Sequence, residues 1–255
     1  MKINYYGLKS IYLHEMDRFL RTLGQSLLSP VISTSLYFIV FGSVIGSYVQ
    51  NIDGISYGSY IVPGLLMLTL LTQSISNTSF GIFFPKFNGT IYEILASPIS
   101  TFEIVLAFVS AGATKTLIVG IVIFLTSMFF VDVQVKFPLL MIFLLILVSF
   151  TFALFGFLIG LLSKNFEQMS IVPSLVSTQM VFLGGSLYSL DMLPKFWQIV
   201  TYFNPVVYLI NGLRFSFYGI SDFNIWLSIG TMVLFLLICI TFVSVILKKG
   251  YNIKS

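Results

Sequence analysis

The sequence has very little charge for its length. Only 9% of its 255 residues are Asp, Glu, Lys or Arg, whereas 57% are hydrophobic, and the mean hydropathy is +1.01. A soluble domain carries roughly 25% charged residues, so this chain cannot cover a globular surface with charge and must be solvated largely by lipid. The net charge of +4 is scattered rather than gathered into a basic stripe, which argues against a nucleic-acid partner.

Residues that hold metals or carry out catalysis are also scarce. The chain has one histidine, His14, and one cysteine, Cys239, which are too few for a zinc site and exclude an internal disulfide. It contains no G-x-x-x-x-G-K-S/T phosphate loop and no G-x-S-x-G nucleophile motif. The chain is therefore not expected to be an enzyme, and no catalytic residue, metal site or cofactor of its own is predicted.

Long apolar stretches dominate what remains. A helix needs about 20 mostly apolar residues to cross the hydrocarbon core, and such a segment must be helical because no water satisfies its backbone groups there. The sequence therefore predicts a single all-α integral membrane domain, residues 1–255, with six transmembrane helices. The predicted spans are 27–49, 60–84, 102–131, 138–162, 171–188 and 225–247.

The distribution of lysine and arginine predicts the orientation, because cytoplasmic segments of membrane proteins are enriched in both. With the N-terminus inside, the cytoplasmic side collects Lys2, Lys9, Arg18, Arg21, Lys86, Lys164, Lys248, Lys249 and Lys254. The outside keeps Lys136, Lys195 and Arg214, and Lys115 falls within a span. Both termini are basic, so we expect an N-in, C-in topology with an even number of crossings.

Residues 3–22 have an amphipathic pattern. Apolar residues recur at helical spacing from Leu8 to Leu23, and charged residues such as Arg18 and Arg21 take the opposite side. The pattern predicts an interfacial helix in the inner headgroup layer, in contact with membrane lipid. It serves either as a topological anchor or as a grip on a partner, and Glu15 can pair with Arg18 along its surface.

A compact polar segment, KFNGTIYEILASPIST at 86–101, joins the second and third predicted spans. Thr90 and Glu93 fit a capping box, and Pro98 disfavours helical geometry at Ser97. The pattern predicts a cytoplasmic helix of about two turns, which is too short to be stable alone in water. Its apolar side is therefore buried either against its own chain at the membrane surface or in a cytoplasmic protein.

Residues 184–222 are too apolar for an ordinary loop and too interrupted to cross the membrane. Pro194 suits a helix start, and Asn204-Pro205 separates this helix from a second one that ends near Gly219. Such short helices are typical of re-entrant segments, here on the outer side. They form either a gate or a static lid. The candidate pathway or gate residues in this segment are Tyr188, Asn204, Pro205 and Arg214.

Ionisable groups within or beside the spans are few, and each needs a partner. Lys115, a further pathway candidate, lies mid-span and is either a structural hydrogen-bond donor or part of the pathway. It cannot reach Glu103, which lies about 18 Å away along the same helix. In the outer segment, Arg214 can pair with Asp191 or Asp222, or meet a lipid phosphate.

These ordered features resemble the type-2 ABC transporter permease family over essentially the whole chain. The resemblance rests on YIVPGLLMLTLL at 60–71, FNGTIYEILASPIS at 87–100, LGGSLYSLDMLPKFWQIVTYFNPVVYLINGLR at 183–214 and the basic tail after Leu247. In that family the segment like 87–100 is a coupling helix that contacts a separate ATPase subunit. The resemblance implies this role for Thr90, Tyr92, Glu93, Leu95, Ser97 and Pro98.

The same resemblance implies an exporter in a bacterial cytoplasmic (inner) membrane. Two copies of the chain would pair with two ATPase subunits, which bind ATP and Mg²⁺, and the cargo would be a lipid-linked glycan, a lipid or a drug-like amphiphile. From the residues alone, two other hypotheses stay open: an ATP-independent carrier or channel, and a membrane assembly protein without transport. A carrier of that kind would favour internal inverted repeats, and none is evident.

Overall fold

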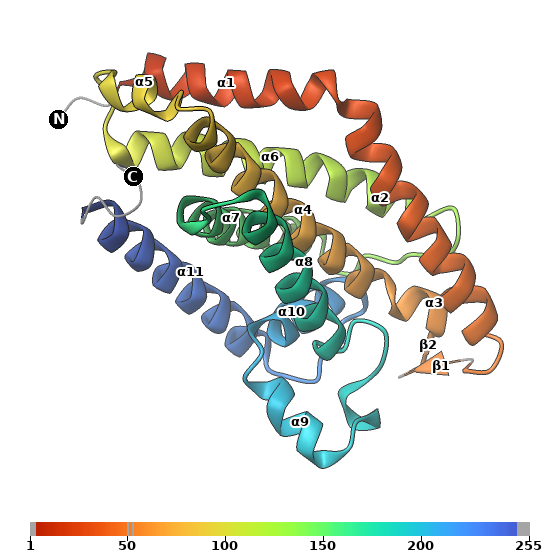
Figure 1. Ribbon diagram of the computed structural model, residues 1–255. Helices are drawn as coiled ribbons and strands as arrows, with labels where there is room; N and C mark the ends of the chain where they lie inside the picture. The colour runs from red at the N-terminus through yellow and green to blue at the C-terminus, as the bar shows by residue number, and fades with distance from the viewer. Residues whose placement is uncertain (1–3, 50, 53, 249–255) are drawn as a thin grey trace.

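The computed structural model describes residues 4–49, 51–52 and 54–248, and it is a bundle of long helices (Figure 1). The long elements are α2 (Leu23–Tyr37), which continues as the π-helical η1 (Phe38–Ile45), α4 (Val62–Phe87), α6 (Thr101–Ser127), α7 (Pro138–Leu162), α8 (Phe166–Leu183) and α11 (Ile225–Lys248). The shorter elements are α1 (Tyr5–Arg21), β1 (Asn51–Ile52), β2 (Ile55–Ser56), α3 (Tyr57–Tyr60), α5 (Ile91–Ala96), η2 (Leu190–Met192), α9 (Lys195–Tyr202) and α10 (Pro205–Tyr218).

Five helices in the described part of the chain are long and apolar enough to cross a membrane. They are Leu23–Ile45, Tyr57–Phe87, Thr101–Ser127, Pro138–Leu162 and Ile225–Leu247. This confirms an α-helical integral membrane protein. Among the residues described, the strands form one antiparallel hairpin, in which Asn51 pairs with Ser56. Lys2, Lys249 and Lys254, which contributed to the predicted orientation, lie outside the described residues.

The helix that covers the fifth predicted span begins and ends earlier than 171–188. It is α8, Phe166–Leu183, and it is not one of the five helices counted above as long and apolar enough to cross. At its start the Asn165 side chain accepts a hydrogen bond from the backbone N–H of Gln168, at 2.8 Å. At its end Gly184-Gly185 stops the helix, because Gly185 adopts a left-handed conformation with φ of 73° that favours glycine.

Residues 184–222 are divided into short helices as the sequence predicts. Pro194 is the N-cap residue of α9, and the Asn204 side chain caps α10, whose first residue is Pro205. Gly219, with φ of 75°, ends α10. The division of 184–222 into two short helices is therefore confirmed, whereas their depth in the membrane stays a prediction.

The core of the bundle is α4, which packs most closely against α7. Gly156 and Gly160 of α7 face the α4 backbone, where a side chain at either position would collide with the carbonyl group of Ile75 or Ser79. The Ser79 hydroxyl also donates a hydrogen bond to the carbonyl oxygen of Gly156, at 2.8 Å. Small residues that allow such close approach are typical of packing between membrane helices.

We expect Gly160→Ala to destabilise the protein, because the added methyl group meets backbone that cannot move cheaply. Overpacking of this kind costs about 2 kcal/mol, which corresponds to a fall of about 5 °C in the unfolding midpoint. Thermal unfolding of the detergent-purified protein measures it. Gly24→Ala is the matched control, because no atom lies within 4 Å of a methyl group added there. Equal midpoints for the two variants would contradict the packing.

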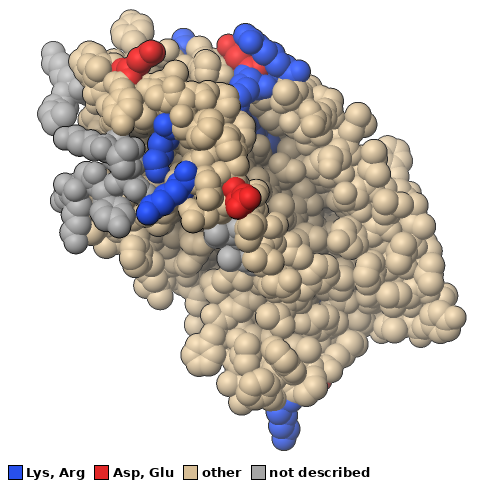
Figure 2. Space-filling view, viewed as in Figure 1, with Lys and Arg blue, Asp and Glu red and all other residues tan. Residues whose placement is uncertain are grey.

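The two ends of the bundle differ. Ile11 of α1, Ile91 of α5 and Leu247 of α11 belong to one apolar cluster, so the starts of α1 and α5 and the end of α11 lie together. The hairpin, η2 and α9 lie at the opposite end (Figure 1). Figure 2 shows that most charged side chains on this face gather toward the α1 and α5 end, that one Lys or Arg projects at the opposite end, and that the wide area between them shows none. The uncharged middle is the part of this face that suits lipid.

Candidate functional site

The short helix α5 lies on the charged end of the bundle and has two different sides. Ile91 is buried in a cluster with Ile82 and Ile104, which fixes α5 on its own chain. Tyr92 is 51% exposed and Leu95 is 39% exposed, so a second apolar surface faces away from the bundle. Both burial sites that the sequence left open are thus present in one helix: one side is packed, and the other is free to contact a partner.

Of the remaining residues predicted for coupling, Glu93 lies within α5, and Thr90, Ser97 and Pro98 flank it. Thr90, Glu93 and Pro98 are exposed and Ser97 is half-buried, so together with Tyr92 and Leu95 they share the surface that α5 and its flanks form. Ser97 has an extended backbone with φ of −73° and ψ of 153°, as the following proline predicts. Their contact with an ATPase stays a prediction.

The capping box predicted at Thr90 and Glu93 is wrong. Thr90 has helical rather than extended backbone geometry, and its hydroxyl donates to the carbonyl oxygen of Pro85 at 3.3 Å. The capping box lies instead at the start of α6, where the Glu103 N–H donates to Ser100 Oγ at 3.3 Å and the Ser100 N–H donates to Glu103 Oε2 at 2.6 Å. Ser100 has the extended backbone that an N-cap requires.

The two positions give opposite expectations for substitution by alanine. Ser100→Ala removes the cap of α6 and should lower the free energy of unfolding by about 1 kcal/mol. Thr90→Ala removes no cap of α5 and should change it by less than about 0.5 kcal/mol. Denaturant or thermal unfolding in detergent compares the two variants. A larger loss of unfolding free energy for Thr90→Ala would support a capping box at Thr90 and Glu93 instead.

Asn4 connects the start of α1 to the junction between α5 and α6. Its backbone N–H donates to Glu103 Oε1 at 2.5 Å, and its side-chain amide donates to the carbonyl oxygen of Pro98 at 3.1 Å. The same side chain caps α1 by accepting from the Gly7 N–H at 3.1 Å. One residue therefore links the start of α1, the segment that follows α5 and the start of α6.

Lys115 has an ion-pair partner, Glu15, that was not predicted from the sequence. Its Nζ donates to Glu15 Oε2 at 2.7 Å, and Arg18 Nη2 donates to the same oxygen at 2.8 Å. The side chains of Glu15 and Lys115 are each 3% exposed, whereas that of Arg18 is 30% exposed. The guanidinium group of Arg18 also lies 5.2 Å from the centre of the Phe80 ring. The predicted pair of Glu15 and Arg18 is confirmed, and it extends into the membrane helix α6.

The signal for this contact lies in the pattern of α1. Ile11, Glu15 and Phe19 recur at intervals of four and so share one helix face, which means that a carboxylate stands between two apolar residues. A buried acid of this kind requires a cation on the facing element. Arg21, in contrast, is exposed at the end of α1; its contact with lipid headgroups stays a prediction.

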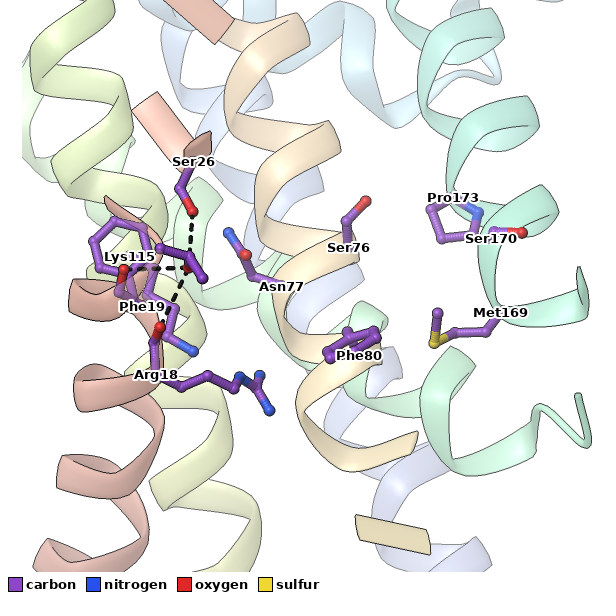
Figure 3. A pocket seen from close by; sticks show the side chains of 11 residues that line it. Arg18, Phe19, Ser26, Ser76, Asn77, Phe80, Lys115, Met169, Ser170 and Pro173 are labelled. Atoms are coloured by element: carbon purple, nitrogen blue, oxygen red, sulfur yellow. Dashed lines mark hydrogen bonds between the residues drawn. The ribbon is translucent and has the colours of Figure 1, made fainter. Parts of the chain in front are cut away.

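Arg18 and Lys115 both line a pocket of about 440 Å³ (Figure 3). Its walls come from the end of α1 and the start of α2, from α4, from Lys115 of α6, and from the start of α8, as Figure 3 shows. Both apolar and polar side chains line it: the apolar ones are Phe19, Phe80, Met169 and Pro173, and the uncharged polar ones are Thr22, Ser26, Ser76, Asn77 and Ser170. Two of the predicted residues thus meet in a pocket large enough for a small ligand.

The pathway candidates of the outer segment lie at the other end of the bundle. Arg214 is 2% exposed, and its guanidinium group donates to the carbonyl oxygen of Gly185 at 2.8 Å and lies 4.0 Å from the centre of the Tyr60 ring. Of the two acids proposed as its partner, Asp222 forms the ion pair, at 3.7 Å. Arg214 therefore holds α10 against α3 and the α8 terminus.

Tyr188 and Asn204 reinforce the same junction. The Tyr188 hydroxyl donates to the carbonyl oxygen of Phe182 at 2.8 Å, and the Asn204 amide donates to the carbonyl oxygen of Met180 at 2.6 Å. Pro205 begins α10 beside them. These residues lie well away from the pocket of Lys115, so the structure does not bring the predicted pathway residues together in one place.

A bundle of membrane-crossing helices with a polar pocket and an exposed short helix at one end is typical of a transport protein of the membrane. Residues 6–218 match the family model described as ABC-2 type transporter, and the chain belongs to this family. It is 38% identical to the inner membrane transport permease YadH of Escherichia coli strain K12, over the full length of both chains.

More distant relatives agree. Nodulation protein J of Rhizobium leguminosarum biovar viciae is 23% identical over 84% of this chain and 83% of that protein. Nodulation protein J of Rhizobium meliloti strain 1021 is 26% identical over 81% of this chain and 79% of that protein. This chain is accordingly a transmembrane transport permease and a multi-pass protein of the inner membrane.

Proposed function

We propose that two copies of this chain form the export pathway of an ATP-driven transporter, and that α5 couples them to separate ATPase subunits, which bind ATP and Mg²⁺. The observation that carries the proposal is the double-sided α5. Burial of Ile91 makes the helix part of the bundle, while the exposed Tyr92 and Leu95 offer a partner an apolar surface with Glu93 beside it. Because this helix of 6 residues is fixed on one side, a displacement imposed by a partner would be transmitted to α4 and α6.

The topology that we propose has six crossings with both termini inside. Six long helices separate the starts of α1 and α5 from the outer segment, and the end of α11 returns to the α5 side. The sixth crossing is α8, whose 18 residues extend about 27 Å, close to the roughly 30 Å of the hydrocarbon core. The larger number of Lys and Arg side chains at the α1 and α5 end supports placing that end in the cytoplasm.

The second copy and the cargo follow from the same arrangement. The pocket beside Lys115 opens on one side of a single chain, so a second chain facing it would complete a pathway between the two. Its mixture of apolar and polar side chains suits an amphiphile, and we propose a lipid-linked glycan, a lipid or a drug-like amphiphile as the cargo. Membrane lipid covers the exposed apolar surfaces of α2 and α11.

The proposal is tested by purifying the tagged chain from its native membranes and measuring ATP hydrolysis in the eluate. Wild-type protein should bring down an ATPase subunit with a phosphate-loop sequence. The Tyr92→Ala/Glu93→Ala double variant should lower the co-purified ATPase activity at least about tenfold, because exposed aromatic contacts at interfaces are worth about 2 kcal/mol or more. The buried contacts of Ile91 remain intact in this variant.

The matched control is Phe203→Ala/Asp191→Ala, which removes an exposed aromatic residue and an exposed acid at the opposite end of the bundle. It should leave the co-purified activity unchanged. If the wild-type protein brings down no ATPase, or if the two double variants behave alike, α5 is not a coupling helix and the exporter function is wrong.

A further inference from the structure

The pocket beside Lys115 has an unequal balance of charge. Among the residues that line it, Arg18 and Lys115 are cationic and none is acidic. The one carboxylate paired with both, Glu15, is not part of the lining. Two positive charges against one negative charge leave this wall of the pocket with a net charge of +1, so its field favours an anion.

Lys115 retains hydrogen-bonding capacity toward the pocket. An ammonium group has three donors, and the bond that the structure gives Lys115 goes to Glu15. Arg18 likewise has five N–H donors, and one of them donates to the same carboxylate oxygen. Its side chain is 30% exposed. A cation at this depth is costly unless it faces an anion, water or protein. An anionic ligand would lower that cost further.

The rest of the lining specifies more than a free anion. Hydroxyl and amide groups of Ser26, Ser76 and Asn77 can donate to the oxygens of a headgroup, whereas Phe80 and Met169 form an apolar wall. Figure 3 shows these groups on facing helices around one space. Ser76 to Phe80 lie between about 10 and 17 Å from the Phe87 end of α4, within the inner half of the span under the topology proposed above.

We propose that this pocket binds the anionic headgroup of an amphiphile, a phosphate or a carboxylate, through Lys115 and Arg18. Glu15 is the internal anion that holds the two cations, and the ligand shares them with it. This inference rests on the export function proposed above and assigns a charge to its cargo. It also separates two roles within α1, because Arg18 belongs to the pocket and Arg21 does not.

The experiment measures how amphiphiles protect an introduced thiol in the pocket. Ser170→Cys is placed in the full chain with Cys239→Ala, which removes the one native cysteine. The rate of its reaction with N-ethylmaleimide is measured in maltoside detergent, with dodecyl phosphate, dodecyltrimethylammonium or inorganic phosphate added at equal concentration. We expect dodecyl phosphate to protect the thiol about tenfold better than the cationic amphiphile, because charge-assisted hydrogen bonds have this strength. Ser221→Cys, at the outer end, is the control position and should be protected by neither.

Variants that change the charge of the pocket should change the preference for dodecyl phosphate in directions that a purely structural role would not produce. Lys115→Gln and Arg18→Gln should each abolish most of the preference for dodecyl phosphate, whereas the matched Arg21→Gln should keep it. Glu15→Gln should strengthen the preference, and dodecyl phosphate should raise the unfolding midpoint of this variant while dodecyltrimethylammonium does not. If Glu15→Gln proves too unstable to purify, the Arg18→Gln and Arg21→Gln pair still decides the matter, because both positions are partly or fully exposed.

Each contrary result has a definite meaning. Equal protection by the two dodecyl amphiphiles would overturn the anionic preference, and equal protection by inorganic phosphate would overturn the amphiphile. Loss of preference in Arg21→Gln would move the effect from the pocket to the general charge of α1. The assay uses the permease without an ATPase, so a missing ATPase partner would refute the exporter while leaving this binding result intact, and the reverse also holds.

Discussion

Glu15→Gln is expected to lower the free energy of unfolding by about 3 kcal/mol, because it leaves the buried ammonium group of Lys115 without its carboxylate. Lys115 is 2% exposed, and the bond to Glu15 crosses from α1 to α6. The fall corresponds to about 10 °C in the thermal unfolding midpoint of a chain of this size. Unfolding of the detergent-purified protein, followed by the loss of its monodisperse chromatographic peak, measures it.

The reverse substitution should be milder. In Lys115→Gln the carboxylate of Glu15 still accepts a hydrogen bond from Arg18 at 2.8 Å, so no buried charge is left alone. We expect a loss of about 1 kcal/mol. The double variant Glu15→Gln/Lys115→Gln should be more stable than Glu15→Gln alone, because it removes the orphaned cation.

Asp17→Asn is the matched control for Glu15→Gln. It neutralises an acid on the same helix that is exposed to solvent, and it should change the stability by less than about 0.5 kcal/mol. Equal losses for Asp17→Asn and Glu15→Gln would show that the charge of α1, rather than the buried pair, sets the stability. A double variant less stable than Glu15→Gln would contradict the account of the orphaned cation.

The ion pair of Glu15 and Lys115 also shows which contacts the sequence does not predict. The five apolar helices were predictable because each needs only its own composition, and the break at Asn204-Pro205 was predictable because its turn chemistry is local. Glu15 and Lys115 are 100 positions apart, and no local pattern states which residue will face a buried acid. The sequence could show that each was misplaced on an apolar face, but only the packing of α1 on α6 shows that they meet.

The coupling segment shows the same limit at shorter range. Its short helix and its end at Ser97 follow from the sequence, because a proline restricts the residue before it. Two capping-box candidates lie ten residues apart, Thr90 with Glu93 and Ser100 with Glu103, and both fit the pattern equally. The backbone decides between them: Thr90 follows directly on the turn after α4 and stays helical, whereas Ser100 is extended after Pro98.

Arg214→Lys is expected to destabilise the outer segment although the charge is conserved. The guanidinium group of Arg214 stacks 4.0 Å from the centre of the Tyr60 ring while it donates to the Gly185 carbonyl and pairs with Asp222. A lysine ammonium is a point charge that cannot lie flat on the ring and reach in two further directions. We expect a loss of about 2 kcal/mol, the size of a desolvated cation–π contact.

Tyr60→Phe is the control that isolates the stacking, because it keeps the ring and removes only a hydroxyl whose bond to the Tyr188 carbonyl is 3.5 Å long. It should retain nearly full stability, since so long a hydrogen bond contributes little. Tyr60→Leu should approach the loss of Arg214→Lys, and combining the two should cost less than the sum of the separate losses, because both break one contact. Fully additive losses would mean that Arg214 and Tyr60 act independently, and α10 would then be held mainly by the hydrogen bonds of Asn204 and Tyr188.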